Sequence, residues 1–209
     1  MRIVKPGFEV LSALDGMEIL RHLEKCGRVC YKSEEHITQD SCIAFVRGIV
    51  KRGHEAVIEH ASVTVKFTVD RGVSHEIVRH RVASFAQEST RYCNYAKDKF
   101  GEEITVIEPC FFERGTAGWN EWEKGCKAAE KSYFALLKAG ATPEKARTVL
   151  PNSLKTELVM TANMREWRHF FKLRTDKPAH PQMREVACML LAFFKEKIPV
   201  LFDDIEVEA

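Results

Sequence analysis

Two short runs of alternating apolar and polar residues constrain the fold of this chain more than any other feature. One run extends from Val63 to Val69 and the other from Leu154 to Met160. Such alternation is typical of a strand with one buried face. The segments between and around these runs have mostly helical periodicity, without the regular strand-helix-strand order of a parallel sheet. The sequence therefore predicts an α+β fold, in which a small sheet is flanked by several helices.

Length and composition favour a single domain over residues 1–209, large enough to bury a core. A formal charge of +2 gives no general indication of nucleic-acid or membrane binding. No run reaches transmembrane length, and the N-terminus lacks the apolar segment of a signal peptide. Seven cysteines without a CxxC pair are typical of reduced thiols. We therefore expect a cytoplasmic protein.

Two helices are expected near the N-terminus. The first begins at Asp15, with Glu18 at the capping-box position, and ends at Gly27. The second runs from about Thr38 to Arg52, and Gly53 follows it. Both have the apolar periodicity of structural helices.

The segment HEAVIEH, residues 54–60, contains two histidines that are six residues apart. The zinc-binding motif HExxH places its histidines four apart on one helical face, so this spacing argues against a metal. We expect no metal in the protein and a loop between helix and strand at this point.

The segment from Arg79 to Tyr92 is rich in arginine and contains few carboxylates. The guanidinium group is a rigid fork of donors that matches phosphates and planar carbonyl groups. The segment therefore favours an anionic ligand, although a solvated basic turn has the same composition. Its section from Ser84 to Ser89 is expected to be a loop.

A helix is expected from Asn163 to Arg174, with Asn163 as its cap and Glu166 at the capping-box position. One face carries a basic stripe with little to neutralise it. Arg174 continues the apolar row, where a charge is costly without a partner; an exposed last-turn arginine favoured by the helix dipole is the alternative. The C-terminal segment, residues 203–209, is expected to be frayed. The basic stripe on the helix expected from Asn163 to Arg174 consists of Arg165, Arg168, His169 and Lys172.

Several common catalytic patterns are absent from the sequence. There is no GxSxG motif around Ser84 or Ser89, and no glycine-rich phosphate loop. Cys93 has no neighbour that would activate its thiol, so a structural role is favoured. A chain rich in cations and poor in nucleophiles suits chemistry that a bound organic cofactor performs.

The segment from Arg79 to Tyr92 fits the pattern RHRxxSxxxxSxRY, and in this it resembles the flavin-dependent thymidylate synthases. Further similarity to that family lies in four other places: Gly53, His54, Glu59 and His60 in GHxxxxEH; Arg147 ahead of VLP; Asn163 and Arg165; and Leu173, Arg174 and Asp176.

The resemblance implies a mostly antiparallel sheet and a homotetramer with active sites between subunits. Each site would hold FAD and convert dUMP to dTMP, with methylenetetrahydrofolate as one-carbon donor and NADPH as reductant of the flavin. The partners would thus be small molecules, and no cysteine nucleophile would be needed.

The resemblance also implies roles for particular residues. The catalytic residues would be Arg174, which favours the ionised uracil N3, together with Arg91 and Ser89. The dUMP would be held by Glu76, Arg79, Gln87, Glu88, Ser89, Thr90, Arg91, Arg147 and Arg174. The FAD would be held by His54, Ala56, Glu59, Arg79, His80, Arg81, Asn163, Arg165, His169 and His180.

Two other functions remain open at this point. The basic clusters and nearby aromatic residues such as Phe85 and Tyr92 could form a nucleic-acid-binding module, against which the nearly neutral charge argues. A degenerate family member that binds nucleotide and flavin without turnover is the other alternative.

Overall fold

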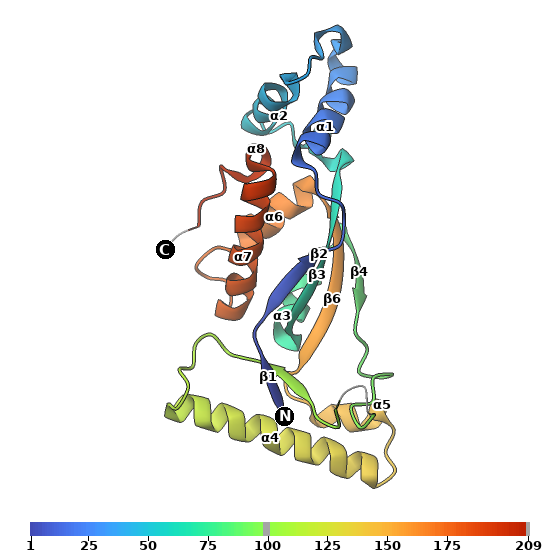
Figure 1. Cartoon of the computed structure of the whole chain (residues 1–209), viewed down its shortest axis with the longest axis vertical. Helices are drawn as coiled ribbons and strands as arrows, with labels where there is room; N and C mark the ends of the chain where they lie inside the picture. Colours follow the sequence, from blue (N-terminus) through green and yellow to red (C-terminus); the bar gives the residue numbers. More distant parts are fainter. Residues whose placement is uncertain (98–100, 208–209) are drawn as a thin grey trace. The chain divides into compact units, whose positions relative to one another are not determined.

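The computed structural model describes residues 1–97 and 101–207. It contains short and long helices and two sheets, the α+β class that the sequence predicts (Figure 1). The strands are β1 (Arg2–Val4), β2 (Gly7–Val10), β3 (Ser62–Asp70), β4 (Ala83–Gln87), β5 (Thr105–Ile107) and β6 (Lys155–Asn163). The α-helices are α1 (Gly16–Tyr31), α2 (Ser41–Lys51), α3 (Arg71–Ile77), α4 (Ala117–Lys138), α5 (Pro143–Ala146), α6 (Met164–Arg174), α7 (Pro181–Lys197) and α8 (Pro199–Phe202). The 3₁₀ helices are η1 (Glu34–His36), η2 (Glu55–His60) and η4 (Arg147–Val149).

The main sheet has four strands in the order β2-β3-β6-β4, and β1 pairs in parallel with β5 in a second, two-stranded sheet. Both runs of alternating residues form strands of the main sheet. In β3, Val63, Val65 and Phe67 are buried while the polar residues between them are only partly covered. The period-two pattern therefore predicted these strands and their buried face correctly.

The chain forms two compact units, and the strands of the main sheet contribute residues to both. The first unit comprises residues 1–7, 67–79 and 86–159, and the second comprises residues 8–66, 80–85 and 160–209. The prediction of one domain over the whole chain stays a prediction.

The core of the first unit lies against α4. Tyr133 of that helix is fully buried and stacks at a tilt on Tyr95, with 5.7 Å between the ring centroids. Val106 of β5 and Leu154 belong to the same cluster, which also receives Ala146 from α5. Burial of these side chains fixes the short helix α5 next to α4, and with it the start of η4 at Arg147.

The core of the second unit is aromatic. Trp167 of α6 packs on Phe170 and Phe171, and Phe194 of α7 and Phe202 of α8 complete the cluster. Aromatic pairs with edge-to-face geometry add to the free energy gained from burial alone. In Figure 1, α6, α7 and α8 lie side by side, and α1 packs against α2.

Two expectations about element ends are wrong. Helix α1 does not end at Gly27 but continues to Tyr31, and Lys32 caps it with a φ of 47°. Gly27 is instead a packing residue, because a Cβ there would lie 2.6 Å from Cε1 of Phe45. The section from Ser84 to Ser89 is not all loop, since β4 extends through Gln87 as the last strand of the main sheet.

The segment from Glu55 to His60 also differs from the expected loop. It is a turn of 3₁₀ helix whose Ile58 is fully buried, with contacts to α6. None of the helices in residues 1–97 and 101–207 has the length and hydropathy needed to cross a membrane.

Candidate functional site

Helix α6 carries most of the candidate flavin site, and its start is fixed by local sequence. Strand β6 ends at Asn163, whose side chain accepts a hydrogen bond from the backbone N–H of Glu166 at 2.9 Å. The indole N–H of Trp167 donates to the carbonyl of Val63 at 3.2 Å, which anchors the helix on β3. Trp167, Phe170 and Phe171 are buried, while Arg165, His169 and Lys172 are exposed along one side of the helix.

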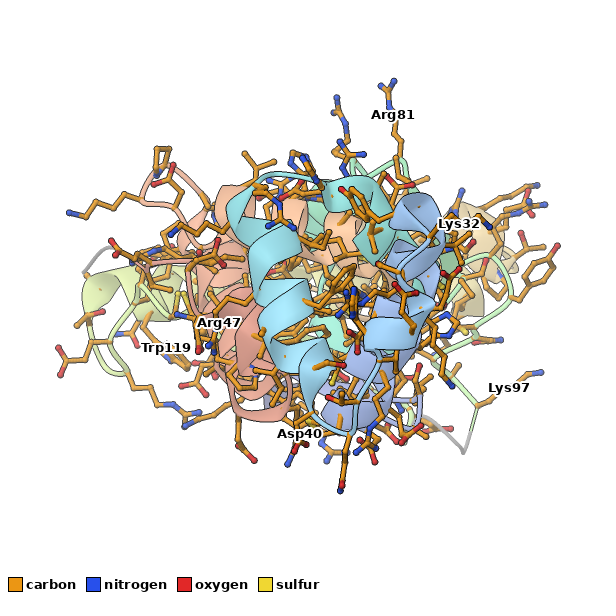
Figure 2. All side chains as sticks on the ribbon, turned by 90° about the horizontal axis from the view of Figure 1, so that it is seen from above. Lys32, Asp40, Arg47, Arg81, Lys97 and Trp119 are labelled. Carbon is orange, nitrogen blue, oxygen red and sulfur yellow. The ribbon has the colours of Figure 1, made fainter. Side chains whose placement is uncertain are left out.

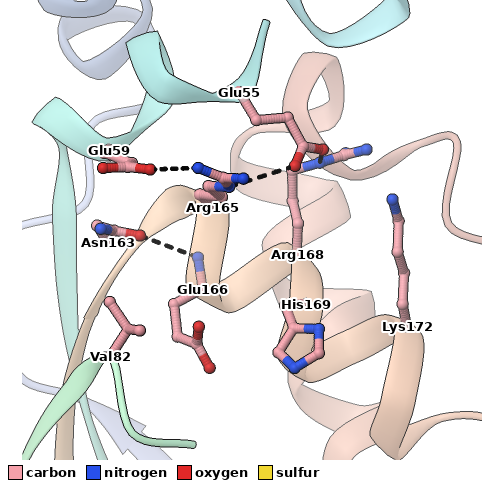
Figure 3. Close-up of a pocket in the computed structure, with 9 residues that line it drawn as sticks. All are labelled: Glu55, Glu59, Val82, Asn163, Arg165, Glu166, Arg168, His169 and Lys172. Atoms are coloured by element: carbon pink, nitrogen blue, oxygen red, sulfur yellow. Dashed lines mark hydrogen bonds and ion pairs between the residues drawn. The ribbon is translucent and has the colours of Figure 1, made fainter. Parts of the chain in front are cut away.

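A pocket of about 420 Å³ lies along this side of α6 (Figure 3). Its volume falls within the range that small-molecule sites usually have. Four of the ten residues predicted to bind flavin line it, namely Glu59, Asn163, Arg165 and His169. The remaining lining residues are Glu55, Val82, Glu166, Arg168 and Lys172.

The arginines of the pocket are already paired with carboxylates, contrary to the expected stripe with little to neutralise it. Arg165 contacts Glu59 at 2.6 Å and Glu55 at 3.6 Å. Arg168 is 2 % exposed and forms a bidentate pair with Asp204, with both nitrogen-oxygen distances at 2.7 Å. It also donates to the carbonyl of Leu201. These carboxylates come from distant parts of the chain, which a helical stripe cannot indicate.

The pocket fits a phosphate-bearing dinucleotide. Arg165 is half exposed and its pair with Glu59 is open to water, so an incoming phosphate can replace that carboxylate at low cost. The Nε of Arg168 is buried without a hydrogen bond among the described residues, 3.5 Å from Oε1 of Glu55. Arg165 and Lys172 are both exposed and supply cations suited to a pyrophosphate.

His80 lies buried beside this pocket, with 3 % of its surface exposed. Its Nδ1 is 2.8 Å from Oε1 of Glu166, and its Nε2 is 3.1 Å from Nε of Arg174. The ring also packs edge-on against His169, with 5.4 Å between centroids. Arg174, placed on the apolar row of the helix, therefore has the partner that its position requires.

The pKa of His80 is lowered from its ordinary value, chiefly by burial. The hydrogen bond that His80 donates to Glu166 opposes this shift of the pKa, while the nearby charge of Arg174 adds to it. Lowering of the pKa favours the neutral imidazole near pH 7.

The residues predicted to bind dUMP lie in the first unit, with the exception of Arg174. At the end of β4, Gln87 donates to the hydroxyls of Ser74 and Thr156 at 2.9 and 3.3 Å. These bonds fix the side chain of Gln87 on the sheet. The chain then turns through Ser89, whose hydroxyl accepts from the backbone N–H of Arg91 at 3.3 Å.

The structure brings together two members of this set that are far apart in sequence. Arg147 donates to the hydroxyl of Thr90 at 3.2 Å, while its guanidinium remains exposed. Arg91 is also exposed and lies 3.5 Å from Glu144. The two arginines therefore flank the turn after β4, where their donors suit a phosphate.

Glu88 is directed elsewhere within the first unit. Its carboxylate forms an ion pair with Lys155 at 3.0 Å and accepts from the hydroxyl of Tyr95 at 3.3 Å. A contact between Glu88 and a nucleotide would therefore use its backbone or a rearranged side chain.

The remaining predicted residues differ in exposure. Nδ1 of His54 forms a hydrogen bond with the hydroxyl of Tyr31 at 3.1 Å. Helix α1 therefore holds the segment at His54 by a hydrogen bond as well as by packing. Arg81 extends away from the ribbon (Figure 2). The others are Glu76 and Arg79, near the end of α3, Ala56 in η2, and His180, which caps α7.

Five of the residues that line the pocket were not among those predicted to bind flavin. Arg168 and Lys172 follow Arg165 at helical spacing, so the stripe itself pointed to them. Glu166 was interpreted only as a capping residue, and its carboxylate instead contacts His80. Nothing in the local sequence distinguished Glu55 or Val82.

Comparison with known proteins identifies the family of this chain. The family model described as thymidylate synthase complementing protein matches residues 14–200. The flavin-dependent thymidylate synthase of Geobacter sulfurreducens is 34% identical over 184 residues, covering 85% of this chain and 78% of the relative. That of Corynebacterium aurimucosum is 32% identical over 206 residues, covering 88% and 79%.

Among solved structures, the UMP/dUMP methylase PolB from Streptomyces cacaoi, bound with 5-Br dUMP, has a similar fold. The TM-score is 0.78 with 22% sequence identity, and the match covers 97% of this chain and 96% of that one. The matched motifs, the fold and these relatives agree: the chain belongs to the thymidylate synthase complementing protein family, that of the flavin-dependent thymidylate synthases, which are flavin-dependent methyltransferases.

Proposed function

We propose that this protein converts dUMP to dTMP by reductive methylation. Methylenetetrahydrofolate supplies the one-carbon unit, NADPH supplies the two electrons through FAD, and the products are dTMP, tetrahydrofolate and NADP⁺. The observation that carries this proposal is the pocket on α6, where predicted flavin residues from separate parts of the second unit lie together. Sequence similarity to flavin-dependent thymidylate synthases over most of the chain supports it.

The cofactor would be held in the pocket by charged side chains on η2 and α6. Arg165 and Lys172 would contact its phosphates, and Glu59 would accept hydrogen bonds from hydroxyl groups after release from Arg165. When bound, FAD supplies the hydride chemistry that no side chain can provide. His80 has both ring nitrogens engaged within the chain, so its contact with flavin would use the ring or the backbone.

The nucleotide would be bound by the arginines that flank the turn after β4. Arg91 and Arg147 are exposed and carry donors suited to the 5′-phosphate, with Ser89 and the backbone of the turn between them. Arg79 and Glu76 would complete this set. Arg174 would stabilise the ionised uracil N3, since a fixed cation favours the anionic form by about 1.4 kcal/mol for each pK unit.

A cysteine nucleophile has no role in this proposal. Burial raises the pKa of the thiols of Cys42, Cys126 and Cys188, which keeps them protonated and weakly nucleophilic. Activation of the pyrimidine by N3 ionisation takes the place of attack by a thiolate. We further propose the family's homotetramer, with active sites between subunits, in the cytoplasm.

The test is direct. Purified protein should absorb as a flavoprotein, and the flavin spectrum should change when dUMP is added. It should form dTMP only when dUMP, methylenetetrahydrofolate and NADPH are all present. Protein that binds no FAD on reconstitution, or that binds FAD and dUMP without forming dTMP, would reject the proposed activity.

A further inference from the structure

Two hydrogen bonds link Glu166, His80 and Arg174, and their role goes beyond stabilising helix α6. All three side chains belong to the second unit, and Glu166 and Arg174 come from opposite ends of α6. His80 lies between them, with its two ring nitrogens 2.8 Å from Glu166 Oε1 and 3.1 Å from Arg174 Nε. A single imidazole thus connects the carboxylate to the guanidinium.

The chemistry of the two partners fixes the protonation of the ring. A carboxylate can only accept, so Nδ1 of His80 must carry the proton that it donates to Glu166. A guanidinium can only donate, so Nε2 must present a lone pair to Arg174. His80 is therefore the neutral Nδ1–H tautomer, and it is a hydrogen-bond acceptor for Arg174 only in this state.

The surroundings of His80 favour the same state. The groups that face the ring from α6 are Glu166, His169, Arg174 and the ring of Phe170. Burial lowers the pKa of His80, and the charge of Arg174 lowers it further. A doubly protonated ring would place its second N–H against a guanidinium donor.

The same residues include a set of metal-type ligands, because atoms of His80, Glu166 and His169 lie within 4.8 Å of one another. A divalent cation there would take one ring nitrogen of His80 from its present partner and would lie next to the charge of Arg174. The observed contacts instead use the ring to bind a guanidinium. Orientation of Arg174 is therefore the role that the geometry favours.

We propose that Glu166 is a positioning residue, which holds His80 in the Nδ1–H tautomer so that Nε2 orients the guanidinium of Arg174 toward the substrate. The assignment of Arg174 to the pyrimidine rests on the proposed function. Arginine has a long side chain with considerable rotamer entropy, and Arg174 is the last residue of α6. A hydrogen bond at Nε fixes the plane of the fork, and with it the direction of the terminal nitrogens.

The first test reads the tautomer and does not need activity. Protein labelled with ¹⁵N-histidine should show His80 with a protonated Nδ1 and an unprotonated Nε2, the signal being assigned by its loss in His80→Gln. In Glu166→Gln the side-chain amide can donate as well as accept, so the Nε2–H tautomer should become populated. An Nε2–H or doubly protonated His80 in the wild-type protein at pH 7 would overturn the proposal.

The second test separates positioning from stability. Glu166→Gln should lower kcat for dTMP formation about 10-fold to 100-fold at saturating FAD and dUMP, as expected for a misplaced charge. The matched control is Glu24→Gln, which alters a buried carboxylate of α1 that accepts from Arg28 and Ser41. The control should change thermal stability and leave the His80 tautomer and kcat unchanged.

A third comparison uses the ring position itself. The amide of His80→Gln reaches the place of Nε2 and can accept from Arg174, whereas that of His80→Asn reaches the place of Nδ1. His80→Gln should therefore retain about ten-fold more kcat than His80→Asn, the value of one lost hydrogen bond. Equal rates in these two variants would contradict the positioning role.

The outcomes distinguish this inference from the proposed function. If the wild-type protein forms no dTMP, the proposed function fails, and the tautomer still reports on the contact between Glu166 and His80. If dTMP forms and Glu166→Gln keeps the wild-type kcat, the positioning role is wrong while the activity stands. A rate loss in Glu166→Gln that is present at limiting FAD and disappears at saturating FAD would also overturn it, because Glu166 would then act on the flavin.

Discussion

Asp204 forms a bidentate ion pair with the guanidinium of Arg168, in which each carboxylate oxygen lies 2.7 Å from a different terminal nitrogen. Arg168 is buried in the wall of the candidate flavin pocket, whereas Asp204 lies two residues beyond the end of α8. Ile205 beside it is 3 % exposed. The segment after α8, expected to be frayed, is therefore ordered at Asp204 and Ile205 by an ion pair and an apolar contact.

This ion pair predicts a pH-dependent contribution to stability. Arg168 lowers the pKa of Asp204 below its ordinary value, so the carboxylate stabilises the fold above about pH 4, and this contribution is lost as pH falls through the lowered pKa. Asp204→Asn should reduce the free energy of unfolding by about 1–2 kcal/mol at pH 7, since half of the Asp204 side chain is exposed. Urea unfolding at pH 7 and pH 3 checks this, because the difference between wild type and variant should shrink at pH 3. An equal difference at both values would contradict the assignment.

Removal of the cation at position 174 should abolish turnover without loss of the fold. Arg174→Ala removes the charge proposed to favour the ionised uracil N3, and a loss of about 10²–10³-fold in kcat is expected for a preorganised electrostatic contact. Arg174→Lys, which retains the charge but not the fork, should recover part of the rate. Flavin content and thermal stability should match the wild type in both variants. Wild-type turnover in Arg174→Ala would reject the role.

Arg81 offers a test of the flavin site at a residue that packing does not constrain. Its side chain is exposed and extends away from the ribbon (Figure 2), so substitution should not disturb the core. Arg81→Ala should lose bound FAD, measured by absorbance after purification and by titration of the apoprotein. Arg47→Ala, an exposed arginine on α2, serves as the control and should keep the wild-type FAD content. Unchanged FAD binding by Arg81→Ala would remove this residue from the site.

Two glycines within helices should respond oppositely to alanine. In Gly27→Ala the new Cβ would lie 2.6 Å from Phe45 Cε1, and overpacking should cost about 1–3 kcal/mol of stability. Gly125 lies in α4 with no atom within 4 Å of its Cβ position, so Gly125→Ala should stabilise the protein by about 0.4–1 kcal/mol. Thermal unfolding of the two variants measures both effects. A stabilising Gly27→Ala would show that Phe45 can move aside.

The elements that the sequence predicted correctly are those specified by neighbouring residues. Asp15 and Asn163 cap their helices by accepting from the backbone N–H three residues on, a bond that depends on local chemistry alone. Burial on alternate residues fixed both long strands of the main sheet in the same way. By contrast, β4 is short and carries exposed Ser84 and Ala86, so its strand conformation depends on pairing in the sheet.

The candidate site was predictable to the extent that motifs named its residues. Asn163, Arg165 and Glu59 were expected in one flavin site, and all three line one pocket of the structure. The ion pairs could not be predicted, because Arg168 and Asp204 are 36 residues apart in the chain. Nor could the partner of Arg174, since the contact with His80 spans 94 residues. The roles of the candidate site residues in binding stay predictions.

Strand β6 has one further consequence. Thr156, near its start, accepts a hydrogen bond from Gln87 beside the candidate nucleotide residues, and Asn163, at its end, caps the helix of the candidate flavin pocket. Between these two positions the side chains of β6 alternate between the two faces of the sheet without interruption. Insertion or deletion of one residue there would therefore exchange the faces of all strand residues beyond the change. Length changes among relatives should consequently accumulate in the connections outside β6, while this strand tolerates substitution but not a change of residue number.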